Sequence, residues 1–287
     1  MKITPASAAL GAVVTDLDLR RPLTATQCEE LLAAWRRHHL LVFPDQALDD
    51  AQHVQICELF GPVQVEANGQ RFNYVTNHGT TGLVAEERFE WHMDYCFTPY
   101  PVTAISLYAQ ELPEGGTATY FANNVRGFET LPEPLKQRAL ALQIRNLGDL
   151  ASGDQMAVLY RKPRPGADHP HVITPLVRTH PDTGERHLYC CHMMTDHIEG
   201  LPDAQSDALL ADIFAHLYAP ANVYEHRWAL GQLVIWDNTA LQHARPDSSL
   251  ARGARTLRRV CVAEHDVVKF LAPYWARTQW RETLSDV

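Results

Sequence analysis

Apolar positions at helical spacing predict four helices in this chain. They span about 25–38, 49–60, 132–142 and 203–217. The first is preceded by Thr24-Ala-Thr-Gln27, which has the pattern of a capping box. Gly61-Pro62 is expected to end the second helix, and Pro132 stands near the start of the third. The fourth is expected as a helical insert, near 200–220, between predicted strands.

Short apolar runs bounded by turn residues predict strands. They are HLLVF (39–43), VTAISLYA (102–109), MAVLYR (156–161), HVITPLVRT (171–179), RHLYCCH (186–192), VYEHRW (223–228), GQLVIWD (231–237) and RTLRRVCVA (255–263). Early helices followed by many strands and one helical insert indicate a mainly β fold with flanking helices. This is an α+β arrangement built on a sandwich or barrel. Neither an internal repeat nor a low-complexity linker divides the 287 residues, so we expect one domain over 1–287.

Composition and charge narrow the class of partner. Hydrophobic residues make up 46% of the chain and charged residues 21%, which is ordinary for a globular protein. The formal charge is −9 and no Lys/Arg run is present, so neither nucleic acid nor an anionic membrane is expected as a partner. No apolar stretch approaches a membrane span, and MKITPASAALGAVV at the N-terminus lacks the pattern of a signal peptide. The six cysteines lack CxxC spacing, so we expect reduced thiols in a cytoplasmic protein.

Candidate metal ligands occur in two distant runs. EWHMDYCF contains His92 and Asp94, and WDNTALQHARPD contains His243. Two imidazoles and one carboxylate are the set with which non-haem Fe(II) oxygenases hold their metal on one face. Residues i and i+2 share a face of an extended strand, so we expect His92 and Asp94 to reach one ion from one strand. The turn residues of Trp236-Asp237-Asn238 are expected to end a strand and begin a loop at the rim of this site.

Another group of possible ligands has a simpler interpretation. His187, His192 and His197 lie close to Cys190-Cys191 and resemble a zinc-binding group in composition. Adjacent cysteines on a strand point in opposite directions, so we interpret this segment as a strand followed by a loop. The patterns of a GxSxG elbow, an HExxH zinc helix, a Walker A loop and a dinucleotide-binding loop do not occur in the sequence.

Two arginines four residues apart add candidate anion-binding groups. Arg255 and Arg259 would share one face of the last predicted strand with Leu257, while Arg258 would face the other way. A buried guanidinium needs an anion, and its planar fork matches a carboxylate. Two such forks near a metal would hold two anions, an oxoacid and an acidic substrate. A solvated cationic strand edge is equally consistent with this pattern.

Taken together, these runs resemble the taurine/α-ketoglutarate dioxygenase family, also called TauD/TfdA-like. The similarity extends over roughly 4–268 and includes LLVFPDQALDDAQ, WHMD, ISLYAQELPEGGTATYFAN, LVRTHPDTGERHLY and RWALGQLVIWDNTALQHARPD. The resemblance implies a double-stranded β-helix, a jelly-roll or cupin-like fold, with the metal at its open end. It also implies an Fe(II)- and 2-oxoglutarate-dependent dioxygenase that consumes O2, releases succinate and CO2, and oxidises its substrate at a C–H bond. Dimers or tetramers are common in the family, so a homo-oligomer is expected.

By position, the resemblance assigns roles to individual residues. It implies that His92, Asp94 and His243 bind Fe(II). It places Arg255 at the distal carboxylate of 2-oxoglutarate, with Thr119 as its hydroxyl partner. Arg259 would lie where members of the family hold the carboxylate or sulfonate of the substrate.

The chain departs from taurine-oxidising members at two positions. These members carry a histidine after Phe60-Gly61, where this chain has the run PVQVEANG with Glu66, and Arg88 replaces a smaller amide before the first ligand. Glu66 and Arg88 at a pocket mouth would suit a small acidic or amino-acid-like, zwitterionic molecule. Two alternatives use the same residues differently: a zinc-dependent hydrolase with the same His/Asp/His site, and a non-catalytic jelly-roll binding protein.

Overall fold

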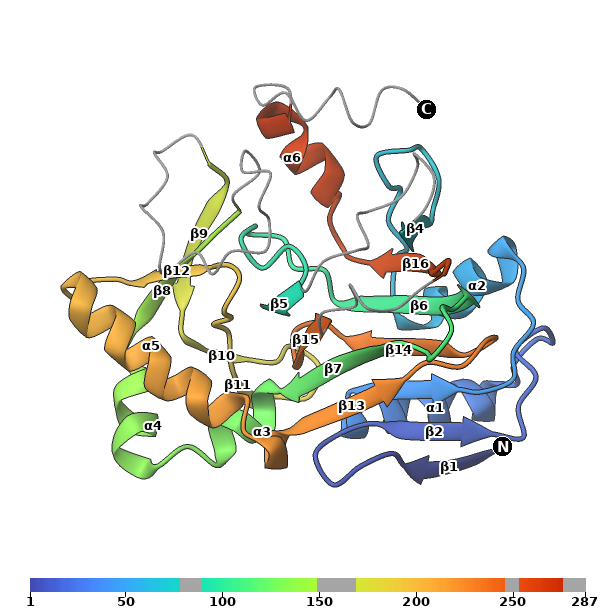
Figure 1. The fold of residues 1–287 in the computed structure, drawn as a ribbon, viewed down its shortest axis with the longest axis horizontal. Helices are drawn as coiled ribbons and strands as arrows, with labels where there is room; N and C mark the ends of the chain where they lie inside the picture. Colours follow the sequence, from blue (N-terminus) through green and yellow to red (C-terminus); the bar gives the residue numbers. More distant parts are fainter. Residues whose placement is uncertain (78–88, 149–168, 246–252, 276–287) are drawn as a thin grey trace.

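Two β-sheets face each other at the centre of the protein (Figure 1). The computed structural model describes residues 1–77, 89–148, 169–245 and 253–275, and the predicted strand at 156–161 lies outside these ranges. The larger sheet has seven strands, in the order β1 (Lys2–Pro5), β2 (Ala12–Thr15), β3 (Leu40–Phe43), β14 (Leu233–Asp237), β6 (Ala104–Glu111), β16 (Thr256–Val262) and β4 (Asn73–Thr76). The facing sheet has four, in the order β13 (Val223–Arg227), β7 (Ala118–Asn123), β15 (Leu241–Arg245) and β5 (Phe89–His92).

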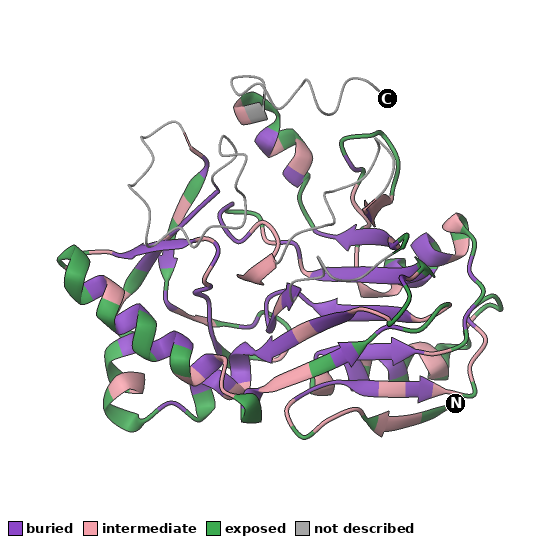
Figure 2. Cartoon of the chain, in the orientation of Figure 1, coloured by how far each residue is buried: buried purple, intermediate pink, exposed green. Residues whose placement is uncertain are grey.

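The main core fills the space between these two sheets. Leu107, Trp236 and Leu257 enter it from the large sheet, and Phe121 and Leu241 enter it from the small one. All five are buried, and most of the length of the central strands has the buried colour in Figure 2. Neighbouring strands within both sheets pair antiparallel, except for β2 and β3, which are parallel. The result is the sandwich that the sequence predicts.

Two helices cover the outer face of the large sheet. They are α1 (Ala25–His38) and α2 (Asp50–Cys57), the latter continued by the short 3-10 helix η1 (Glu58–Phe60). Apolar residues of α1, such as Leu31 and Trp35, pack with the outward side chains of β3 and β14. Side chains alternate along a strand, so the same strands serve both cores.

The remaining helices and strands form an extension at one end of the sandwich (left in Figure 1). The helices are α3 (Asn124–Glu129), α4 (Glu133–Leu140), α5 (Asp203–Leu217) and the 3-10 helix η3 (Pro220–Asn222). The strands are β8 (Gln143–Leu147), β9 (His171–Pro175) and β12 (Thr195–Ile198) in one sheet, and β10 (Val177–Thr179) with β11 (Arg186–Leu188) in another. α6 (Val267–Trp275) follows β16. None of the helices in the described ranges is long and apolar enough to cross a lipid bilayer.

The four predicted helices are confirmed. Thr24 caps α1 with the reciprocal Gln27 bonds of a capping box, and Asp49 caps α2 with Gln52 in the same way. The predicted strands in the described ranges are shifted or shortened by a few residues, except that the strand predicted at 171–179 is wrong as one element, because it divides at Leu176 into β9 and β10, which belong to different sheets. The mainly β class with flanking helices is therefore confirmed.

Candidate metal centre

Two strands of the small sheet bring the two predicted histidine ligands together. His92 ends β5 and His243 lies in the middle of β15, and the two residues are direct partners in the antiparallel register. Side chains of such partners project on the same side of the sheet. Their ring centroids are 4.0 Å apart. A register shift between His243 and Arg245 interrupts the pairing immediately beyond this point.

The third predicted ligand arrives by a different route from the one expected. β5 ends at His92, and Asp94 stands in the turn that follows, so the prediction that both ligands lie on one strand is wrong. Tyr95 has a φ of 59°, which reverses the chain directly after Asp94. Asn238 fixes this turn, because its side chain accepts from the Asp94 N–H and donates to the Asp94 C=O, each at 3.0 Å. The sharp turn places the carboxylate beside the imidazoles.

The donor atoms of the three residues form a compact group. Asp94 Oδ1 lies 3.3 Å from His92 Nε2 and 3.7 Å from His243 Nε2. One ligand atom from each residue can be chosen so that all three lie within 4.8 Å of one another, and no second such group occurs in the described ranges. His92 Nδ1 lies 2.7 Å from the Glu90 C=O, an arrangement that assigns the proton to Nδ1 and leaves Nε2 free as a ligand. The arrangement fits a single transition-metal ion.

Electrostatics favour the metal-binding protonation states of Asp94 and His243, whereas a metal must displace a proton that Asp94 stabilises on His92. Burial alone would raise the pKa of Asp94, but the His92 hydrogen bond and the nearby His243 and Arg259 hold it well below its usual range. Burial, with His92 close by, lowers the pKa of His243 to about 3, so this imidazole is neutral at pH 7. Burial also opposes the charged form of His92, yet the bond to Asp94 raises the pKa of that ring overall. A carboxylate and neutral imidazoles are the forms that bind metal ions.

Arg255 is a buried cation without a described side-chain partner. It precedes β16 and is 3% exposed, and its Nε and Nη1 atoms are buried without a hydrogen bond. Burial and the nearby Arg245 lower the pKa of Arg255 to about 9. A guanidinium remains protonated at neutral pH, so this part of the site holds a buried positive charge. The site therefore offers the buried Arg255 guanidinium to an anion, and because Arg255, Arg258 and Arg259 are all buried, the alternative of a solvated strand edge is wrong.

Arg245 was not singled out from the sequence. It lies on β15 two residues after His243, is buried, and stacks over the Phe89 ring at 4.5 Å. The run QHARPD contains it, but nothing in the sequence shows that its guanidinium approaches Arg255.

Arg259 and Glu66 form a buried ion pair next to the metal ligands. Arg259 Nη1 donates to Asp94 Oδ2 at 3.1 Å, and Nη2 lies 3.2 Å from both carboxylate oxygens of Glu66. Both side chains are less than 10% exposed. The segment carrying Glu66 follows the edge of β16, with an isolated bridge from Val63 to Val262. Glu66 was predicted at a pocket mouth, but it is buried in the interior beside Arg259.

Of the two other predicted site residues, Thr119 lies in the described part of the structure and Arg88 does not. Thr119 lies on β7, is buried, and its hydroxyl oxygen accepts a hydrogen bond from Trp228 Nε1 at 2.9 Å. Its own proton remains available to an acceptor. Arg88 lies outside the described residues.

The third arginine of the run has a structural role. Arg258 faces away from Arg259, as predicted, but it is 1% exposed and lies under α2. Its guanidinium bonds to the Asp50 carboxylate, to His53 Nδ1 at 3.1 Å and to the Leu48 C=O at 3.0 Å. These contacts attach the start of α2 to β16.

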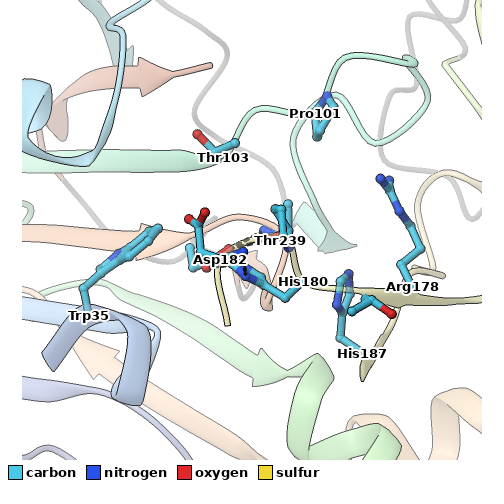
Figure 3. Close-up of a pocket in the computed structure, with 11 residues that line it drawn as sticks. Trp35, Pro101, Thr103, Arg178, His180, Asp182, His187 and Thr239 are labelled. Carbon is cyan, nitrogen blue, oxygen red and sulfur yellow. Dashed lines mark hydrogen bonds and ion pairs between the residues drawn. The ribbon is translucent and has the colours of Figure 1, made fainter. Parts of the chain in front are cut away.

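Two further histidines line a small cavity next to the end of β14 (Figure 3). The cavity measures about 60 Å³ and is lined by His180, His187 and Arg178 among others. His180 Nε2 lies 2.7 Å from Asp237 Oδ2, and the His180 Nδ1 accepts from two backbone N–H groups of the following turn.

The segment that carries His187 and Cys190-Cys191 was interpreted as a strand followed by a loop. β11 ends at Leu188 and a turn follows, so this interpretation is confirmed.

The buried imidazole of His187 is expected to make the protein less stable in acid. Burial, with His180 close by, lowers the pKa of His187 from 6.5 to about 4. Between these values the unfolded chain binds a proton that the folded chain does not, so the free energy of unfolding falls as the pH drops from 6.5 to 4. The contribution of this residue is about 3 kcal/mol. Urea unfolding at pH 6.5 and at pH 4 measures this loss in the wild type and in His187→Asn. Between the two pH values, the free energy of unfolding should fall by about 3 kcal/mol less in the variant than in the wild type. An equal fall in the two proteins would contradict the assignment.

Comparisons with known proteins agree with this geometry. The chain matches the family model described as "Taurine catabolism dioxygenase TauD, TfdA family" over residues 2–261. It is 31% identical to the (S)-phenoxypropionate/α-ketoglutarate dioxygenase of Sphingobium herbicidovorans over 260 residues, which cover 84% of this chain and 88% of that protein. It is 29% identical to the α-ketoglutarate-dependent 2,4-dichlorophenoxyacetate dioxygenase of Cupriavidus pinatubonensis, with 90% and 96% covered.

Solved structures agree as well. A taurine dioxygenase from Burkholderia xenovorans superposes with a TM-score of 0.77 at 26% identity, covering 91% of this chain and 90% of that one. AAD-2 in complex with Mn(II) and N-oxalylglycine gives a TM-score of 0.77 at 28% identity, covering 92% and 97%. These structures confirm the jelly-roll fold, and the matches together confirm the resemblance drawn from the motifs. The chain belongs to the TauD/TfdA family of α-ketoglutarate-dependent dioxygenases, enzymes that use 2-oxoglutarate as cosubstrate together with a metal ion.

Proposed function

We propose that this enzyme is an Fe(II)-dependent oxygenase whose iron is held by His92, Asp94 and His243. The observation that carries the proposal is the cross-strand pair of imidazoles with a carboxylate turned toward them, all three donor atoms within 4.8 Å. Two imidazoles and a carboxylate on one face leave coordination positions open for other molecules. Iron bound there would supply the dioxygen chemistry that side chains lack.

Arg255 is proposed to bind the distal carboxylate of 2-oxoglutarate. Its buried guanidinium has two nitrogen atoms without partners, and Arg245 adds a second positive charge close by. An anion that enters this site gains charge-assisted hydrogen bonds from these nitrogen atoms and offsets the cost of the buried cation. Thr119 is proposed as the hydroxyl that completes this subsite, because its proton has no acceptor in the Trp228 contact.

The substrate is proposed to be a small acidic or amino-acid-like molecule that is oxidised at a C–H bond, with release of succinate and CO2. Named relatives act on phenoxypropionate, on 2,4-dichlorophenoxyacetate and on sulfate esters. The Glu66–Arg259 pair lies directly behind Asp94 and is proposed to form part of the substrate side of the centre, together with Arg88. These residues position the substrate and exclude water, while the metal and cosubstrate supply the oxidising power.

Metal dependence tests the proposed function. The metal-free protein is loaded with Fe(II) or with Zn(II), and succinate formation from 2-oxoglutarate is measured with ascorbate present. We expect turnover with iron and inhibition by zinc. Hydrolytic activity supported by zinc, without any succinate formed with iron, would instead identify the enzyme as a zinc-dependent hydrolase. Absence of iron binding would favour a non-catalytic binding protein.

A further inference from the structure

The guanidinium of Arg259 is already occupied by acidic side chains. It is the nearest described cation to the ligand carboxylate, with Nη1 at 3.1 Å from Asp94 Oδ2, and a substrate anion would be drawn to it. Yet Nη2 lies 3.2 Å from both oxygens of Glu66. Only Nε is buried without a partner.

The contact between Glu66 and Nη2 limits how an anion can bind to the Arg259 guanidinium. A carboxylate or sulfonate can approach with two parallel bonds along the Nη1/Nη2 edge or along the Nε/Nη2 edge. Both edges include Nη2, which Glu66 engages. A substrate anion therefore cannot form a two-pronged contact with Arg259 unless Glu66 moves away.

Displacing Glu66 is unfavourable in this location. Glu66 is 6% exposed, so without Arg259 its carboxylate would be a buried charge without a cationic partner. A positive or hydrogen-donating group meets the opposite situation, because both carboxylate oxygens of Glu66 face only one nitrogen of Arg259 and can accept further hydrogen bonds.

We propose that Glu66 is a specificity-determining residue that takes the place of a substrate anion on Arg259, so that the substrate group next to the metal centre is an amine or ammonium. This inference rests on the proposed function and names the chemistry selected at the same site. An amino-acid-like substrate would then point its amino end toward Glu66. Its acidic end would be held elsewhere.

The test compares two probes that share a skeleton and differ in the charged group. 2-Phenoxyethylamine and phenoxyacetic acid are titrated calorimetrically, without oxygen, into the protein loaded with Mn(II) and 2-oxoglutarate. We expect the wild type to bind the amine about tenfold more tightly than the acid, and Glu66→Gln to lose that preference or reverse it. Glu66→Asp keeps the charge and should keep the preference. Glu58→Gln is the matched control, because Glu58 pairs with Arg71 at an exposed position.

Two further measurements separate the outcomes. Unfolding midpoints of all variants verify that each protein is folded, and metal and 2-oxoglutarate binding are measured in the same samples. An affinity ratio that is the same in wild type and Glu66→Gln, including failure of both probes to bind, would overturn the role of Glu66 alone. Loss of metal and 2-oxoglutarate binding by the wild type would overturn the proposed function as well.

Discussion

Replacing His243 by alanine is expected to abolish metal binding and 2-oxoglutarate turnover while the protein stays folded. The variant removes one of three ligands, and the imidazole opposite it on β5 cannot compensate. The fold should persist, because the Nδ1 atom of this ring is buried and unpaired and the ring adds no described hydrogen bond to the sheet. Metal content after dialysis, succinate formation and the unfolding midpoint measure the three effects. His92→Ala and Asp94→Ala are expected to behave in the same way.

A control distinguishes ligand loss from general damage. His216 lies on α5, where its ring contacts the Thr130 hydroxyl at 3.0 Å, and His216→Ala should leave metal binding and turnover intact. Retention of one metal ion per chain by His243→Ala, with normal turnover, would remove this residue from the centre.

Replacing Arg255 by methionine is expected to raise the KM for 2-oxoglutarate strongly. A hydrogen bond to a charged group contributes about 1.5–3 kcal/mol, which corresponds to a loss of about 10- to 150-fold in affinity. The folded protein without cosubstrate should lose no stability, because the buried guanidinium has no described side-chain partner and lies near a second cation. Initial rates at varied 2-oxoglutarate and thermal unfolding of the free protein measure both effects.

A raised KM together with unchanged stability would identify Arg255 as a residue that binds 2-oxoglutarate. Arg20→Met is the matched control, since Arg20 is exposed and pairs with Asp18, and its KM should equal that of the wild type. An unchanged KM in Arg255→Met would refute the assignment. A large loss of stability without cosubstrate would show that Arg255 supports the fold instead.

Local patterns in the sequence predicted local structure well. Thr24 and Gln27 define the start of α1 because the capping bonds involve residues three positions apart. The strand carrying His243 was missed, since LQHAR has too few apolar residues to suggest a strand. Its pairing with β7 and β5, not its composition, makes it extended.

Long-range contacts account for what the sequence could not show. His92, Asp94 and His243 were predicted as ligands from their residue types and spacing, and they lie together in the structure, yet the turn that carries Asp94 depends on Asn238, 144 residues away. Glu66 was expected at a pocket mouth, whereas it pairs with Arg259 across 193 residues. Such contacts are set by the packing of the two sheets, which no local pattern encodes.

Crystallography of the protein soaked with Mn(II) and 2-oxoglutarate, without oxygen, tests the central claim most directly. Anomalous scattering locates the manganese independently of any assumption about its ligands. The account predicts one metal ion coordinated by His92, Asp94 and His243, with the distal carboxylate of 2-oxoglutarate against Arg255. Manganese bound elsewhere, or these three side chains free of metal at saturating concentration, would contradict it.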